Sequence, residues 1–145
     1  MTYSPVLGPL IALAAWTLVM FVWMYATRIP AMRRAGALDN RIGKGPGHLD
    51  SVLPAETQWK AHNYNHLMEQ PTLFYAVVLI LAMMGDRDHT TLGFAWAYVG
   101  LRILHSLIQS TVNVVRYRTI IFALASGCLF LLTIRLTAIL VRTSA

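Results

Sequence analysis

Two long apolar segments of this chain are uneven, because each is polar in one half and apolar in the other. From about Thr57 to Met84, histidine, asparagine and glutamate side chains come first, and an uncharged stretch from Pro71 follows. From about Thr90 to Val115 the order is reversed. The polar residues of its second half are Arg102, His105, Ser106, Gln109, Ser110 and Asn113. If the segments pair as an antiparallel hairpin, the two polar halves lie at the same depth, and we expect the functional site between them.

Two further segments are apolar almost throughout. No charged residue occurs from Thr2 to Thr27, which is long enough to cross the roughly 30 Å hydrocarbon layer of a bilayer as a helix. The run from Thr119 to Val141 is interrupted only by Arg135. With the two uneven segments, the sequence predicts four transmembrane helices, at about 4–28, 57–84, 90–115 and 119–142.

Composition supports a membrane protein. The chain is 57% hydrophobic and only 12% charged, which is more apolar surface than one soluble core of this length buries. A long polar loop at 30–55 and short polar turns near 85–89 and 113–118 separate the four segments. Short connections make neighbouring helices antiparallel. We therefore expect one membrane domain over 1–145, an all-α antiparallel bundle of four transmembrane helices.

Basic residues predict the orientation. The first loop with its flanks, and the third connection, hold most of them: Arg28, Arg33, Arg34, Arg41, Lys44, Lys60, Arg116 and Arg118. By the positive-inside rule these two connections face the cytoplasm and both termini face outward. The net charge of +6 thus reflects topology. Nucleic-acid binding is disfavoured, because the basic residues lie at membrane edges and are not interleaved with stacking aromatic side chains.

The hairpin also predicts a register. Equal helical rise in both legs places residues of equal depth opposite each other. The expected neighbours are Glu69 with His105 and Ser106, His66 with Gln109, and His62 with Asn113. Arg102 lies about one turn deeper, within reach of Glu69. A charged side chain near the bilayer centre costs at least about 2.5–3.5 kcal/mol, so Glu69 and Arg102 should be paired, hydrated or both, and an ion pair between them would satisfy each.

The same residues carry a family resemblance. The stretch from Ala61 to Tyr75 resembles the second-helix signature of the MAPEG family, the membrane-associated proteins of eicosanoid and glutathione metabolism. In that signature an asparagine, an acidic residue and a proline precede apolar residues. The segment from Arg102 to His105, with Arg116 and Arg118, resembles the family's third helix and the arginine that opens its fourth. The resemblance covers essentially the whole chain and is that of a bacterial member.

The resemblance implies a homotrimer of four-helix bundles that binds glutathione as co-substrate between subunits near the cytoplasmic side. Enzymes of the family conjugate or isomerise lipophilic substrates or reduce lipid hydroperoxides. Carried over by position, Arg102 and Arg118 would bind and activate the thiol. The positions implied to hold glutathione are Asn63 or Asn65, Glu69, Arg102, His105 and Arg28. Arginines bind the carboxylates of glutathione well and stabilise a thiolate, so the residue chemistry agrees.

The resulting expectation is a glutathione-dependent transferase or peroxidase in the bacterial inner membrane, acting on a lipophilic small molecule in a cleft that opens to the cytoplasm. The alternative is a non-catalytic protein of the same fold that binds lipid or assembles with a larger complex. A metal site at His62, His66, Glu69 and His105 is the less favoured interpretation, because such histidines are more often hydrogen-bonded. A stripe of small residues, Gly93, Ala97 and Gly100, suits close helix approach at a subunit contact.

Overall fold

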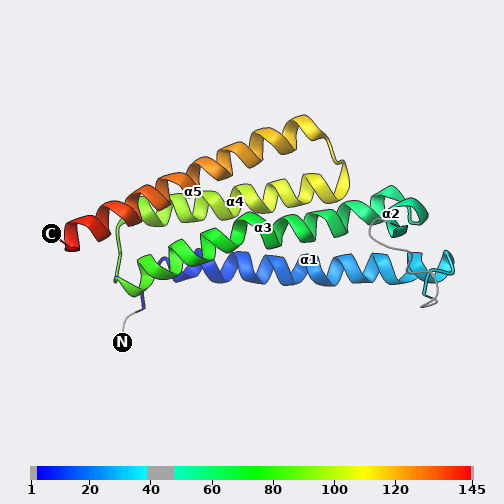
Figure 1. The fold of residues 1–145 in the computed structure, drawn as a ribbon, viewed down its shortest axis with the longest axis horizontal. Helices are drawn as coiled ribbons and strands as arrows, with labels where there is room; N and C mark the ends of the chain where they lie inside the picture. The colour runs from blue at the N-terminus through cyan, green and yellow to red at the C-terminus, as the bar shows by residue number, and fades with distance from the viewer. Residues whose placement is uncertain (1–2, 39–47, 145) are drawn as a thin grey trace.

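The computed structural model describes residues 3–38 and 48–144, and within them the chain is an all-α four-helix membrane bundle (Figure 1). The helices are α1 (Leu7–Arg34), the short α2 (His48–Val52), α3 (Ala55–Met83), α4 (His89–Thr111) and α5 (Val115–Ser144). The four long helices are each long and apolar enough to cross a membrane. The protein is therefore an integral membrane protein, as the uncharged runs predicted.

The long helices are antiparallel to their neighbours in sequence, with α1 packed chiefly on α3 and α4 chiefly on α5 (Figure 1). Both ends of the chain and the α3–α4 connection lie at one end of the bundle, which we call the terminal end. The opposite end holds α2 and the α4–α5 connection, and we call it the loop end (Figure 1).

α1 is longer than expected. It continues through Pro30 to Arg34, where a loop was expected, because a proline removes one hydrogen bond without ending a helix whose neighbouring turns are intact. The helix closes at Gly36, which has a φ of +65°, and the Ala37 N–H donates to the Met32 carbonyl at 2.9 Å. Within the same expected loop, α2 adds a turn of helix. The expected basic residues Arg41 and Lys44 lie outside the described residues.

The α4–α5 connection lies about four residues earlier in the chain than the expected helix ends at 115 and 119 imply. α4 ends at Thr111 and α5 begins at Val115, so Arg118 belongs to the first turn of α5. Asn113 takes a φ of +52°, a conformation that asparagine tolerates better than most residues. This tight turn fixes Arg118 beside the end of α4.

The interior is divided along the helix axes, as the uneven segments predicted. Toward the terminal end it is an apolar core, in which the rings of Phe74 and Tyr98 stack with centroids 4.4 Å apart. Toward the loop end it is polar. The buried polar residues there are Thr57, Gln58, Asn63, Arg102, His105, Ser106, Gln109 and Ser110. Buried polar side chains in lipid need partners, so this half is where binding or chemistry is to be sought.

Carboxylates at the α3–α4 connection hold Arg135 of α5. Its guanidinium lies 2.8 Å from Asp88 and 3.5 Å from Asp86, and Asp86 also accepts the Thr91 hydroxyl at 2.7 Å. Asp88 caps α4 by accepting the Thr90 N–H at 2.6 Å. These contacts tie three helices together at the terminal end.

The cap predicts a dependence of stability on pH. The Thr90 N–H, and then Arg135, hold the pKa of Asp88 below its ordinary value of 3.8. A carboxyl whose pKa is lower in the folded state stabilises the fold above its unfolded pKa, and this contribution is lost as pH falls through the folded pKa. Asp88→Ala is therefore expected to melt below the wild type at pH 7 in detergent, with the gap closing below about pH 4. An Asp88→Asn variant keeps a hydrogen-bond acceptor without the charge, so its melting temperature at pH 7 should lie between those of Asp88→Ala and the wild type. An Ala gap that is as wide at pH 3 as at pH 7 would contradict the assignment.

Candidate functional site

Hydrogen bonds across the α3–α4 interface define the register of the polar half. The Asn63 amide donates to the Ser106 hydroxyl at 2.6 Å, and both side chains are fully buried. His66 lies against Arg102 and not against Gln109, so the expected register was wrong by about two turns of α4. The expectation placed the two helix ends level with each other. α3 ends at Met83 and α4 begins at His89, so the five residues from Met84 to Asp88 join them, and the way this connection runs sets the register.

Arg102 is the most unusual buried group. It is fully buried, and its Nη2 donates to the His66 carbonyl oxygen at 2.7 Å, while Nη1 lies 3.4 Å from His66 Nδ1. The guanidinium carbon is 5.7 Å from the centroid of the Phe122 ring, which allows a cation–π contact. Among the described residues, its Nε has no hydrogen-bond partner and no carboxylate forms an ion pair with the guanidinium.

The expected ion pair between Glu69 and Arg102 is not formed. The Glu69 side chain is 68% exposed on the outer face of α3, and its carboxylate is 3.9 Å from His66 Nε2. The His66 side chain thus lies between the Glu69 carboxylate and the Arg102 guanidinium, because Arg102 contacts the same turn of α3 from the interior of the bundle. In the isolated protomer the acid faces outward, at the middle of a transmembrane helix.

Two other predicted ligands are not brought into the cluster. Asn65 is exposed, because two positions along a helix turn a side chain through about 200° from the buried Asn63. Arg28 is half-buried on α1, and no hydrogen bond or ion pair within the described part of the chain joins it to the cluster. Of the predicted residues, the protomer brings together Asn63, Arg102, His105 and, at the mouth, Arg118.

A small cavity of about 180 Å³ lies beside Arg102 at the loop end. Its lining consists of His66, His105, Val115, Arg118, Thr119 and Phe122. The two imidazole rings have centroids 5.1 Å apart, and Phe122 closes the cluster at 5.1 Å from His66. Arg118 donates to the Asn113 side-chain oxygen at 2.5 Å, and its Nε has no partner in the described part of the protein. Among the described residues that line this cavity, Arg118 carries a positive charge and none is acidic, which suits an anionic ligand.

The metal interpretation is not supported by the geometry. His66 and His105 are neighbours, but His62 and Glu69 have exposed side chains on α3. Within residues 3–38 and 48–144, no three His, Cys, Asp or Glu side chains gather as a metal site requires.

Two contributors were missed from the sequence. Phe122 lies one turn after Arg118, a spacing that places both on one face of α5. Gln70 donates to the Ser126 hydroxyl at 2.8 Å and accepts from the Tyr98 hydroxyl at 3.4 Å. Its neighbours Glu69 and Pro71 were used in the resemblance, but nothing in the spacing indicated a contact with α5.

Comparison with known proteins settles the family. The sequence model of the MAPEG family matches residues 6–138. The chain belongs to the MAPEG family. The match covers nearly the whole chain, so this MAPEG protein is a membrane protein of the kind that takes part in glutathione and eicosanoid metabolism. Comparisons with curated proteins and with solved structures give no match.

Proposed function

We propose that this MAPEG protein is a glutathione-dependent transferase or peroxidase acting on a lipophilic electrophile. The observation that carries the proposal is the basic cavity at the loop end, where Arg118 lines the wall and the buried Arg102 has no carboxylate partner among the described residues. A buried cation without a counter-ion is costly, and an anionic ligand offsets that cost. Glutathione supplies two carboxylates and, when ionised, a thiolate.

Arg118 is the residue proposed to stabilise the thiolate. It lines the cavity, its Nε has no hydrogen-bond partner among the described residues, and His66 and His105 line the same cavity. An imidazole accepts the thiol proton, and the resulting thiolate is the nucleophile. In transfer, sulfur bonds to the electrophilic carbon and the leaving group departs. In peroxide reduction, sulfur attacks oxygen, an alcohol leaves, and a second glutathione reduces the sulfenic acid to disulfide and water.

Arg102 has a different proposed role, because a fully buried side chain does not touch a ligand in the cavity. It holds His66 through the carbonyl and Nδ1, and it adds positive charge in surroundings that screen charge poorly. Arg102 is thus a positioning residue. Asn63 supports the same interface through Ser106.

The site requires a second copy of the chain in this proposal. A cavity of about 180 Å³ is smaller than the roughly 300–1,000 Å³ of typical ligand pockets. The exposed polar stripe of α3, His62, Asn65, Glu69 and Thr72, lies within a transmembrane span. Lipid is a poor solvent for such side chains, so a neighbour in a homotrimer would cover them. Asn65, Glu69 and a neighbour's Arg28 would then complete the glutathione site.

The exposed glycines of α4 allow a neighbour to approach closely. A Cβ built at Gly93 or Gly100 would meet no atom within 4 Å. Such open small-residue surfaces let helices pack tightly in lipid. The basic residues Arg33, Arg34 and Arg116 at the loop end support a cytoplasmic location for that end by the positive-inside rule. We accordingly propose a bacterial inner-membrane protein whose termini lie outside the cytoplasm and whose cavity opens toward it.

Calorimetric titration of detergent-purified protein tests the proposal. Glutathione is expected to bind at millimolar concentration or below. Its dimethyl ester, which lacks both carboxylate charges, is expected to bind at least about tenfold more weakly, because charge-assisted hydrogen bonds are lost. Absence of binding by intact oligomers at millimolar glutathione would favour the non-catalytic alternative, a protein that binds lipid or assembles with a larger complex.

A further inference from the structure

A polar cavity lies at the loop end of the bundle, between the last turns of α1 and the start of α3. Its volume is about 590 Å³, and two side chains of opposite charge line it, Arg34 of α1 and Glu56 of α3. Cβ atoms tilt toward the N-terminus of a helix. Arg34, in the last turn of α1, therefore leans toward the bilayer, and Glu56, in the first turn of α3, leans away from it. The two charges thus approach the cavity from opposite sides.

Both charges are available to a ligand. No ion pair within the described part of the chain involves Arg34 or Glu56. Lys60 is the nearest other cation along α3. Its ammonium lies 5.4 Å from the centroid of the Trp23 ring and donates to the Glu56 backbone carbonyl at 2.9 Å, not to the carboxylate. The cavity therefore presents one cation and one anion side by side.

An apolar groove of about 550 Å³ continues from this cavity along the lipid-facing side of α1. Its lining includes Phe21, Val22 and Ile29, which are exposed in the protomer. Ala26 and Pro30 line both the groove and the cavity, so the two are contiguous. Because Pro30 has no N–H, the Ala26 carbonyl lacks its usual helical donor at the point where they meet.

The groove has the depth of one leaflet of a bilayer. α1 has 28 residues, and its midpoint falls between Met20 and Phe21. At about 1.5 Å per residue, Pro30 lies about 14 Å from that midpoint, close to half of the roughly 30 Å hydrocarbon layer. An α1 centred in the membrane thus places the groove among the acyl chains of one leaflet and the charged cavity at the level of its headgroups.

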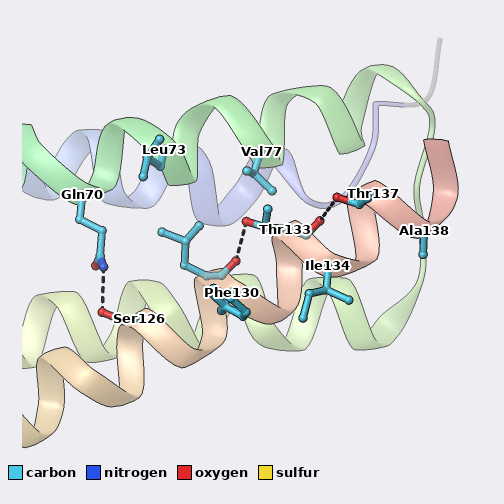
Figure 2. Close-up of a pocket in the computed structure, with 10 residues that line it drawn as sticks. Gln70, Leu73, Val77, Ser126, Phe130, Thr133, Ile134, Thr137 and Ala138 are labelled. Atoms are coloured by element: carbon cyan, nitrogen blue, oxygen red, sulfur yellow. Dashed lines mark hydrogen bonds between the residues drawn. The ribbon is translucent and has the colours of Figure 1, made fainter. Parts of the chain in front are cut away.

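The groove between α3 and α5 lacks such a charged end (Figure 2). Leu73 and Val77 of α3 and Ile134 of α5 line it, and the described side chains around it are all uncharged. Its polar contact is the hydrogen bond from Gln70 to Ser126, at 2.8 Å. Selection of a phospholipid by its headgroup is therefore to be sought at the α1 groove.

We propose that the charged cavity and the α1 groove together bind one phosphatidylethanolamine molecule. Its phosphate accepts from Arg34, its ammonium donates to the Glu56 carboxylate, and one acyl chain lies along α1. The guanidinium fork suits a phosphate, and a primary ammonium has three N–H donors, enough to reach both the carboxylate and the Ala26 carbonyl. This binding does not depend on the thiol chemistry proposed above.

Phosphatidylcholine is the discriminating comparison. It carries the same two charges, but its quaternary nitrogen has no N–H to donate. Neither lipid has a net charge, so the basic surface of the loop end favours neither one. A preference between them therefore reports on acceptors placed for a primary ammonium.

Lipid retention from nanodiscs tests the proposal. The bilayer contains equal shares of the two lipids with identical acyl chains, and lipids retained by the affinity-purified full chain in detergent are counted by mass spectrometry. The wild type is expected to retain about tenfold more phosphatidylethanolamine than phosphatidylcholine, as loss of charge-assisted hydrogen bonds allows. Glu56→Gln should lower this ratio toward one. Arg34→Ala should instead lower retention of both lipids about tenfold, because both present a phosphate.

Two matched controls accompany these variants. Arg33→Ala removes the neighbouring exposed arginine, which points about 100° away around α1, and should change retention by less than about twofold. Ala26→Trp fills the junction of groove and cavity and should abolish retention of both lipids, whereas Ile11→Trp, at an exposed position near the other end of α1, should leave it unchanged. A wild-type ratio of one, a ratio that survives Glu56→Gln, or equal losses in Arg33→Ala and Arg34→Ala would overturn the proposal.

Discussion

Replacing Arg118 by alanine is expected to lower glutathione turnover by about 100- to 1,000-fold, the range found when one preorganised donor to a developing or ionised anion is removed. Arg118 is the guanidinium that lines the basic cavity, and its Nε is unpaired in the described part of the protein. Initial rates with a generic soluble electrophile measure the effect. Ultraviolet absorbance of the bound thiolate should be lost as well, since the thiol then stays protonated at neutral pH.

Arg116→Ala is the matched control. It removes the same charge from the same helical turn, but Arg116 is exposed and points about 200° around α5 from Arg118. Turnover by Arg116→Ala should stay within about twofold of the wild type, as expected for an exposed substitution away from the site. Equal losses in both variants would indicate a role for net charge at the membrane edge, and the assignment of Arg118 would be wrong.

The four spans and their antiparallel order were predictable because they depend on local composition. Runs without charge fix where helices cross lipid, and short polar connections fix their direction. The polar interior at the loop end followed from the same pattern, since polar side chains in a membrane must face one another. Helix ends were less predictable. A proline such as Pro30 is typical of a helix end, but α1 continues through it to Arg34.

The register between α3 and α4 was not predictable from spacing. It depends on how the connection from Met84 to Asp88 joins the two helices and on the angle at which they cross, and neither is encoded in hydrophobic periodicity. The consequence was specific. His66 was expected opposite Gln109, whereas it contacts Arg102 and His105.

Which face of α3 points inward was also open. Helical geometry shows that Asn63 and Asn65 lie on nearly opposite faces, but it does not say which face meets α4. Asn63 is buried against Ser106, and Asn65 and Glu69 are exposed in the protomer. If the site forms between copies of the chain, as we propose, these exposed polar residues belong to the part of it that the analysis of a single chain does not show.

Replacing Arg102 by leucine is expected to separate function from stability. The substitution removes the donor that positions His66 and a positive charge near the cavity, so the affinity for glutathione should fall about 10- to 100-fold, as for loss of a nearby charge in surroundings that screen charge poorly. The ligand-free protein should melt within a few degrees of the wild type or above it. Replacing a buried cation that lacks a carboxylate partner among the described residues by an apolar residue of similar volume is often neutral or stabilising.

Calorimetric titration and thermal melting in the same detergent measure the two effects. The glutathione affinity of Arg102→Lys should lie between those of the wild type and Arg102→Leu. A lysine keeps the charge but lacks the planar guanidinium that reaches both the carbonyl and Nδ1 of His66. Arg135→Ala is the control, since it removes an arginine held by Asp86 and Asp88 at the terminal end and should lower stability without changing glutathione affinity. A strong drop in melting temperature with unchanged affinity in Arg102→Leu would show that Arg102 only ties α3 to α4. The buried charge would then be a structural bond between helices, and the basic cavity would rest on Arg118 alone.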